Sequence, residues 1–244
     1  MKMKRGCLFL LFVFAVVLFT NGMRAEAMHT GFQTDLLSDE KQNRFISNID
    51  IELIGKEPSK KTIQCFDVNN NHLIAIGHGG TERKAVCVYS DDGIFQYGYD
   101  FNCSGDFGVE WDEENLNIYF VRSDVIVSVA PNGEVLDVLE VQNTIDNNSY
   151  VNHFIHSTKR TVGETEYVID NYPRILNLVT ASYSQLIAKD ENGTEITVYD
   201  AGSMQLFNVI ITAVIVCICI AAAVSVIVYQ IKMKTKRNDA NTEN

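Results

Sequence analysis

The chain has little positive charge between its two ends, and this shortage excludes one class of partner. Residues 28–205 carry 12 Lys or Arg against 28 Asp or Glu, a net charge of −16, whereas the whole chain carries −11. A surface of this sign repels nucleic acid and anionic headgroups, and it favours cations or basic partners. Acidic turns on an exported domain produce the same charge. We therefore expect no nucleic-acid function.

Cysteine is also scarce where a disulfide framework would need it. Of six cysteines, one lies in the first 27 residues, and Cys217 and Cys219 lie in an apolar run near the C-terminus. Only Cys65, Cys87 and Cys103 remain for a folded domain, and this odd number permits one disulfide at most. We expect buried free thiols, which pack like small apolar side chains.

Motifs of the common enzyme classes are missing as well. The chain has no G-x-S-x-G turn, P-loop or dinucleotide fingerprint, because the glycines of IGHGG do not open a helix. Cys103 and Ser104 lie in a loop without a nearby His, the base that such a nucleophile requires. The acidic pair Glu113 and Glu114 lies in a turn, where water solvates both groups. The sequence predicts no catalytic residue and favours a protein that is not an enzyme.

What the chain does have begins with a secretory signal pattern in residues 1–27. Lys2, Lys4 and Arg5 precede an apolar run at residues 7–19, and Ala25 and Ala27 occupy the two positions that a signal peptidase checks. This run is short for a bilayer core that needs about 20 residues. The pattern favours a cleaved signal peptide over an uncleaved anchor.

A second apolar segment predicts a transmembrane helix at residues 206–231. Residues 209–228 are uncharged, and this length spans a bilayer as an α-helix. The basic residues that follow, in a tail at 232–244, are Lys232, Lys234, Lys236 and Arg237. By the positive-inside rule the tail is cytoplasmic. The prediction is a single-pass protein of the cell membrane with its ectodomain outside.

The apolar helix also carries a ridge of small side chains. Ala213, Cys217, Ala221 and Ser225 recur every four residues and would let a second helix approach closely. The ridge suits helix association in a homodimer, although Ala-rich spans also produce such ridges by chance. The hydroxyls of Thr212 and Ser225 are expected to bond back to the helix backbone.

Between the two ends, residues 49–205 read as a repetitive all-β ectodomain. The polar segment 28–48 has little periodicity and predicts loose order, and alternation at Ile49, Ile51 and Leu53 predicts a half-buried strand. Three units follow, each with a strand ending in Asp, a polar turn, two further strands, a tight turn ending in Gly, and a fourth strand. These residues are Asp67, Asp112 and Asp170, and Gly93, Gly133 and Gly193. Asp-Gly and Asn-Gly accept the positive φ angles of hairpin turns.

A repeat of about 40 residues with four antiparallel strands has the size of a propeller blade. The units resemble β-propeller repeats of the broad family that includes NHL repeats and the SMP-30/gluconolactonase enzymes, and WDEENLNIYFV is similar to the first strands of a blade in the latter. The resemblance covers residues 67–200 and implies about three blades, a partial propeller. It also implies a metal-dependent lactonase as an alternative function. Those enzymes carry a metal-binding Glu just before the Trp-Asp pair. At the aligned position this chain has Phe107.

Three blades leave apolar faces uncovered, because closed propellers usually have at least four. The sequence permits three solutions. The strand at Ile49 and the polar segment cover one face, two chains join their arrays, or the strands fold into a smaller sandwich. All three keep the all-β class.

Two sets of residues could bind a divalent metal as a cofactor. The carboxylates of the lactonase alternative are Glu110, Asp112 and Asp170. The oxygen ligands of a calcium-type loop are Asp67, Asn69 and Asn71. His72 stands where such a loop needs Gly, and local hydrogen bonding in a turn explains the same residues.

Aromatic residues supply the remaining candidate surface. Phe95, Tyr97, Tyr99 and Phe101 alternate and are expected on one face, where core packing explains them best. If exposed, Tyr97, Tyr99 and Trp111 would suit a glycan or a peptide. The sequence therefore predicts an extracytoplasmic module that binds a protein or glycan. A tethered hydrolase and a structural subunit of an envelope complex are the alternatives.

Overall fold

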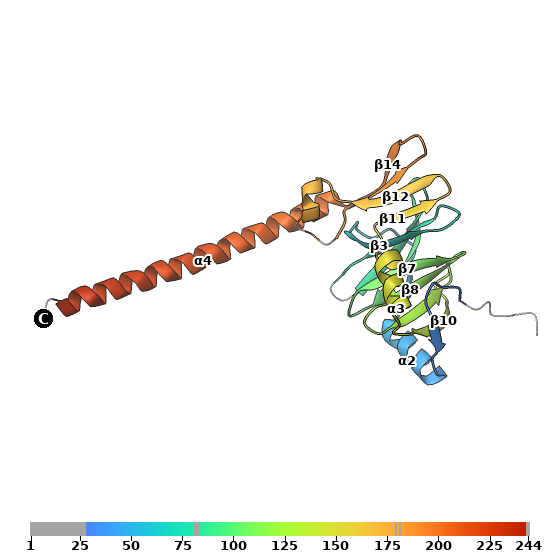
Figure 1. The fold of residues 1–244 in the computed structure, drawn as a ribbon, viewed down its shortest axis with the longest axis horizontal. Coiled ribbons are helices and arrows are strands. Elements are labelled where there is room, and N and C mark those ends of the chain that lie inside the picture. The colour runs from blue at the N-terminus through green and yellow to red at the C-terminus, as the bar shows by residue number, and fades with distance from the viewer. Residues whose placement is uncertain (1–27, 81–82, 179, 181, 243–244) are drawn as a thin grey trace, which may run out of the picture.

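The computed structural model describes residues 28–80, 83–178, 180 and 182–242. Within them the chain forms 14 strands in three antiparallel sheets, and one long helix, α4 (Gly202–Thr242), extends away from the β-rich part (Figure 1). The expected β-rich class and C-terminal apolar helix are confirmed. The predicted signal peptide, residues 1–27, lies outside the described residues.

Each sheet contains four consecutive strands, and two sheets gain a fifth strand from the N-terminal segment. The first sheet has the order β2 (Glu52–Ile54), β6 (Phe95–Asn102), β5 (Arg83–Tyr89), β4 (Ile74–His78), β3 (Ile63–Val68). The second has the order β1 (Thr34–Leu36), β10 (Val135–Val141), β9 (Val125–Val129), β8 (Asn115–Phe120), β7 (Phe107–Asp112). The third has the order β11 (Lys159–Val162), β12 (Thr165–Asp170), β13 (Gln185–Lys189), β14 (Glu195–Asp200).

The hairpin turns form where the sequence predicts them. Gly93, Gly133 and Gly193 adopt φ angles of 79°, 87° and 77°, each between the last two strands of its sheet. A side chain at such an angle is strained, so glycine is the residue that permits these turns. The turn positions therefore set the register of all three strand pairs.

The sheets stack face to face with the first sheet in the middle. One core joins the first and second sheets and contains Tyr99, Phe101, Phe107 and Leu116, all fully buried. A second core joins the first and third sheets around Phe66, Ile76, Tyr167, Leu186 and Tyr199. Because the first sheet is covered on both faces, β4 is buried along its whole length, including His78. Cys65 and Cys87 are buried free thiols, as expected, and Cys103 is a partly buried one.

Short helices close the remaining faces. Helix α2 (Asp39–Ile49) places Phe45, Ile46 and Ile49 against the core between the first and second sheets. Helix α3 (Ile145–Tyr150) continues into the π-helix η1 (Val151–Ile155), which packs on the outer face of the second sheet through Ile155. The loose order expected for residues 28–48 is therefore wrong, because tertiary packing orders the segment as β1 and α2. The strand expected from Ile49 forms in part: Ile49 ends α2, and the strand is β2, which pairs with β6.

The third repeat unit is shifted by one strand relative to its prediction. The unit begins at β11, and Asp170 ends its second strand. Residues expected to form the second strand make the 3-10 helix η2 (Arg174–Leu178) instead. A second correction concerns Phe95, which was expected on the same face as Tyr99. Phe95 packs against the core between the first and third sheets, whereas Tyr99 lies in the core between the first and second sheets. Opposite Val88 and Tyr89, strand β6 contains one extra residue, a β-bulge, so the side chain of Phe95 points to the opposite face of the sheet from Tyr97.

Candidate functional site

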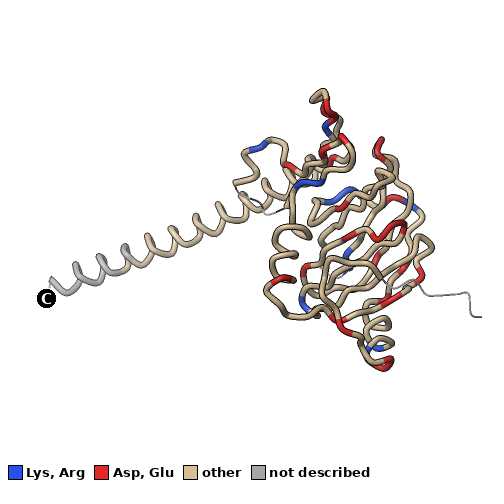
Figure 2. The backbone as a smooth tube through the Cα atoms, turned by 45° about the vertical axis from the view of Figure 1, so that its right-hand side comes forward, with Lys and Arg blue, Asp and Glu red and all other residues tan. Residues whose placement is uncertain are grey.

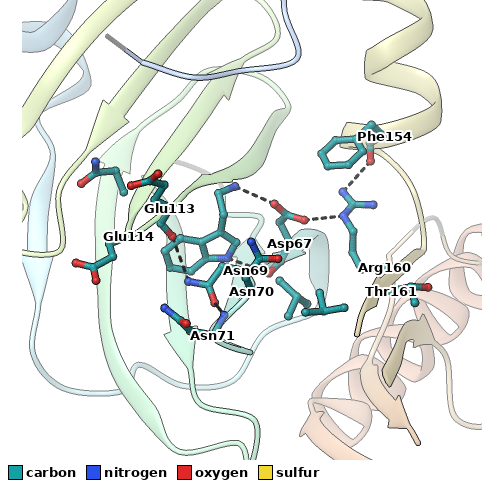
Figure 3. A pocket seen from close by; sticks show the side chains of 13 residues that line it. Asp67, Asn69, Asn70, Asn71, Glu113, Glu114, Phe154, Arg160 and Thr161 are labelled. Carbon is teal, nitrogen blue, oxygen red and sulfur yellow. Dashed lines mark hydrogen bonds and ion pairs between the residues drawn. The ribbon is translucent and has the colours of Figure 1, made fainter. Parts of the chain in front are cut away.

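A polar hollow of about 750 Å³ lies where one end of β3, the β7–β8 turn, η1 and β11 meet. Figure 3 shows its side chains converging from the first, second and third sheets. Its lining residues are Asp67, Val68, Asn69, Asn70, Asn71, Trp111, Glu113, Glu114, Asn115, Phe154, Arg160, Thr161 and Val162. The volume is that of a small-molecule site, since such sites measure roughly 300–1,000 Å³.

The wall of the hollow contains a buried ion pair. Arg160 Nε donates to Asp67 Oδ1 at 2.6 Å, and the two side chains are only 7% and 6% exposed. The backbone N–H of Trp111 donates to Asp67 Oδ2 at 2.8 Å, and its indole N–H donates to Asp67 O at 3.3 Å. Asp67 thus connects all three sheets through one carboxylate. Burial raises the pKa of Asp67, and the Arg160 guanidinium opposes that rise.

Arg160 also connects β11 to the π-helix. One terminal nitrogen donates to Phe154 O at 2.8 Å, and the guanidinium carbon lies 4.3 Å from the centroid of the Phe154 ring. The other donates to Lys159 O at 3.0 Å. A buried guanidinium requires such partners because its N–H groups have lost their water. The geometry of the ion pair is therefore held from several sides.

The rim of the hollow consists of two strained turns that are bonded to each other. His72 and Glu113 adopt φ angles of 59° and 54°, which non-glycine residues rarely do. Asn69 Oδ1 accepts hydrogen bonds from the N–H groups of Asn71 and Leu73, and Asn69 Nδ2 donates to Glu113 O at 3.3 Å. Backbone strain of this kind persists where the surroundings over-determine it, and it often occurs at binding sites.

The side chains at the mouth are amides and carboxylates, which can form hydrogen bonds with a polar ligand. Asn70, Asn71, Glu113 and Glu114 are exposed, and Figure 3 shows them among the side chains that line the hollow. The half-buried Trp111 also lines it. The lining contains no Ser, Cys or His. Such a set can bind a polar ligand through amide and carboxylate groups, with an aromatic surface alongside.

The carboxylates of the lactonase alternative are occupied by other partners. Glu110 accepts hydrogen bonds from Thr30 and from the hydroxyl of Tyr150, and Asp112 accepts one from the backbone of His29. Asp170 accepts hydrogen bonds from the side chains of Asn177 and Arg174, and it ends a second strand where Asp67 and Asp112 end first strands.

No three His, Cys, Asp or Glu residues of the described part form a group suited to a metal ion. The described residues therefore do not fit the metal that the resemblance implies. In the calcium-type set, Asp67 pairs with Arg160, and Asn69 caps its own turn.

The aromatic candidates separate into core and site. Tyr99 is fully buried and donates to Ala130 O at 2.8 Å, and Tyr97 is half-buried beside it. Only Trp111 lines the hollow. Sequence reasoning missed Arg160, Phe154 and the rim carboxylates as site residues. An arginine alternating with exposed positions in KRTV is a weak signal, because its burial depends on Asp67 in a distant strand.

The helix predictions are met in part. Residues Gly202–Gln230 of α4 form a segment long and apolar enough to cross a membrane. Thr212 and Ser225 bond back to the carbonyls of Asn208 and Ala221, both at 2.8 Å, as expected. The predicted ridge residues Ala213, Cys217, Ala221 and Ser225 are all exposed in the single chain.

Comparison of the chain with protein-family models, curated proteins and solved structures finds no match.

Proposed function

We propose that the protein is a single-pass membrane protein whose β-rich part lies outside the cell and binds a hydroxyl-rich ligand, a glycan, in the hollow at Asp67 and Trp111. The observation that carries the proposal is that one polar hollow, built from all three sheets, belongs to a β-rich part joined directly to a membrane-length helix. The Lys and Arg residues after the helix support a cytoplasmic C-terminus.

The joint between the two parts is compact. Only the buried Ala201 separates β14 from α4, and Gln205 in the first turn of the helix is 2% exposed. The side-chain amide of Gln205 donates to Asn171 Oδ1 at 2.8 Å and to Ser182 O at 3.0 Å. This anchoring supports a hollow held at a set distance from the membrane surface.

The arrangement of the sheets supports propeller-like blades. Each sheet has a four-stranded antiparallel core, and the first strands β3, β7 and β11 border the hollow. Around the second sheet, η1 and the N-terminal residues cover the face that a fourth blade would cover. The proposal is a three-bladed array completed by these two segments.

The chemistry of the hollow supports a neutral, hydroxyl-rich ligand. The charges of Asp67 and Arg160 neutralise each other. The exposed groups are amides and the carboxylates of Glu113 and Glu114. Sugar hydroxyls can donate to carboxylates and accept from amides, and a sugar face can pack on the ring of Trp111. Acidic residues are spread over the whole β-rich part (Figure 2), so an anionic ligand is disfavoured.

The test uses the full chain in detergent on an immobilised oligosaccharide array. Trp111 is the only tryptophan of the chain, so its fluorescence follows binding of each array hit in solution. The double variant Glu113→Gln/Glu114→Gln should weaken binding about tenfold or more through loss of charge-assisted hydrogen bonds. The control Glu134→Gln changes an exposed acid in the β9–β10 turn and should bind like the native chain.

Two outcomes would overturn the assignment. Equal affinities of the rim variant and the control would place the ligand elsewhere. Binding of a lysine-rich peptide that disappears at high salt, with no array hit, would make the partner a basic protein segment.

A further inference from the structure

A buried row of polar side chains crosses the outer face of the second sheet. Glu110 pairs with Asn117, Asn117 with Ser128, and Ser128 with Asp137 in the register of the sheet. The first three are 7%, 0% and 2% exposed. We call these four residues the polar row. Burying such groups is unfavourable unless each has a hydrogen-bond partner.

Residues 29–31 supply partners to Glu110 and Asn117 of the polar row, and the hydroxyl of Tyr150 also donates to Glu110. Thr30 Oγ1 and the Gly31 N–H donate to the two carboxylate oxygens of Glu110, at 2.7 and 2.9 Å. Asn117 Nδ2 donates to His29 O at 2.9 Å. The oxygen of this amide, Asn117 Oδ1, is buried and accepts no hydrogen bond from the described residues. Burial raises the pKa of Glu110, and the hydrogen bonds from Thr30 and Gly31 oppose that rise.

The segment is bound in the way that a groove binds an extended peptide. Its N–H groups at His29, Gly31 and Gln33 donate to Asp112, Glu110 and Asn147 in turn. The Asn147 amide returns a hydrogen bond to Gln33 O at 2.8 Å. Side chains thus recognise alternate backbone groups, which is how a strand-like ligand is held.

The first of these contacts follows directly after the sequence signal for cleavage. Ala25 and Ala27 are the small residues that a signal peptidase checks, and the hydrogen-bonded segment begins two residues later. Met28 borders a cavity of about 30 Å³ whose lining includes Asp112, Glu113 and Asp137. Three covalent bonds separate the nitrogens of Met28 and His29, so the Met28 nitrogen lies within about 7 Å of Asp112 Oδ2.

We propose that the Ala27–Met28 peptide bond is the processing site of the chain and that the polar row is the binding site for the new N-terminus. Hydrolysis by water, catalysed by a membrane signal peptidase, leaves a carboxylate on Ala27 and an ammonium on Met28. The ammonium pairs with Asp112, which lines the same small cavity as Met28 and Asp137. The segment that follows the cleaved bond covers Glu110 and Asn117 and forms hydrogen bonds with both buried side chains.

The first experiment identifies the N-terminus of the full chain after export. The α-amines are labelled by reductive dimethylation and the labelled peptide is read by mass spectrometry. The expected peptide begins Met28-His29-Thr30, and the variant Ala27→Leu should retain residues 1–27. A native N-terminus at any other residue overturns the proposal.

The second experiment tests the bound ammonium by digesting the mature full chain with an aminopeptidase. Asp112→Asn keeps a hydrogen-bond acceptor but removes the charge, so it should release Met28 about tenfold faster than the native chain. The control Asp91→Asn, in an exposed turn, should digest at the native rate. Unchanged Trp111 fluorescence shows that the variants are folded. Equal rates for native chain and both variants would refute the ion pair.

Discussion

Replacing Arg160 by Met should destabilise the β-rich part strongly, because it leaves Asp67 charged and buried. The two side chains are 7% and 6% exposed, so neither can regain water when its partner is lost. Breaking a buried ion pair of this kind costs about 3–5 kcal/mol, a large share of a typical stability of about 5–15 kcal/mol. For a domain of this size the melting temperature should fall by about 6–20 °C.

The assay is thermal and denaturant unfolding of the full chain in detergent, followed by Trp111 fluorescence. The tryptophan donates two hydrogen bonds to Asp67, so its emission reports directly on the altered site. Asp67→Asn leaves Arg160 without its counter-charge and should be similarly destabilising. In the double variant both charges are gone, and the loss should be smaller than the sum of the two single losses by about 2 kcal/mol or more.

The matched control is Lys159→Met, one residue before Arg160. Lys159 pairs with Glu166 at 3.0 Å, but the two side chains are 61% and 39% exposed. An exposed pair contributes about 0–1 kcal/mol. If Arg160→Met were no more destabilising than Lys159→Met, the ion pair at the hollow would be hydrated and the reasoning refuted.

Three further predictions concern the core, its pH dependence and the helix joint. Burial lowers the pKa of His78 to about 4, so the free energy of unfolding should fall by about 3 kcal/mol as the pH drops from 6.5 to 4. In acid titrations the variant His78→Phe should reduce this dependence on pH, whereas the exposed control His156→Phe should not. The variant Gly77→Ala should lower the free energy of unfolding, measured in denaturant, by about 1–3 kcal/mol, because the added Cβ would lie 2.9 Å from the Phe107 ring. An unchanged stability would mean that the first and second sheets can move apart to make room. Gln205→Ala should increase protease cleavage at the start of α4, and native resistance would show that its hydrogen bonds do not anchor the helix.

Local sequence signals predicted the elements whose structure depends on neighbours along the chain. The three turn glycines, the strands between them and the apolar helix α4 follow from backbone conformation and alternation, which act over a few residues. The back-bonding of Thr212 and Ser225 is of the same kind. These features need no knowledge of the distant parts of the chain.

The errors lie where a distant contact decides the structure. The apolar segment Arg174–Leu178 was expected to form a strand, yet it forms η2 with Leu176 buried and with Asn177 bonded to Asn171. The first strand of that sheet is β11, and its sequence gives no strand signal because the residue that it buries is the charged Arg160. Phe95 changed face through a bulge of one residue, which the alternation did not reveal.

The sequence by itself determined the acidic β-rich part, its hairpin turns and the apolar helix, because charge, turn conformation and helix length are properties of short segments. Only the tertiary structure decided the sites. Asp67 and Arg160 are 93 residues apart, and Thr30 and Glu110 are 80 apart, so their pairing depends on how three sheets stack. A buried charge or polar row is stable only when such a partner arrives from elsewhere in the fold.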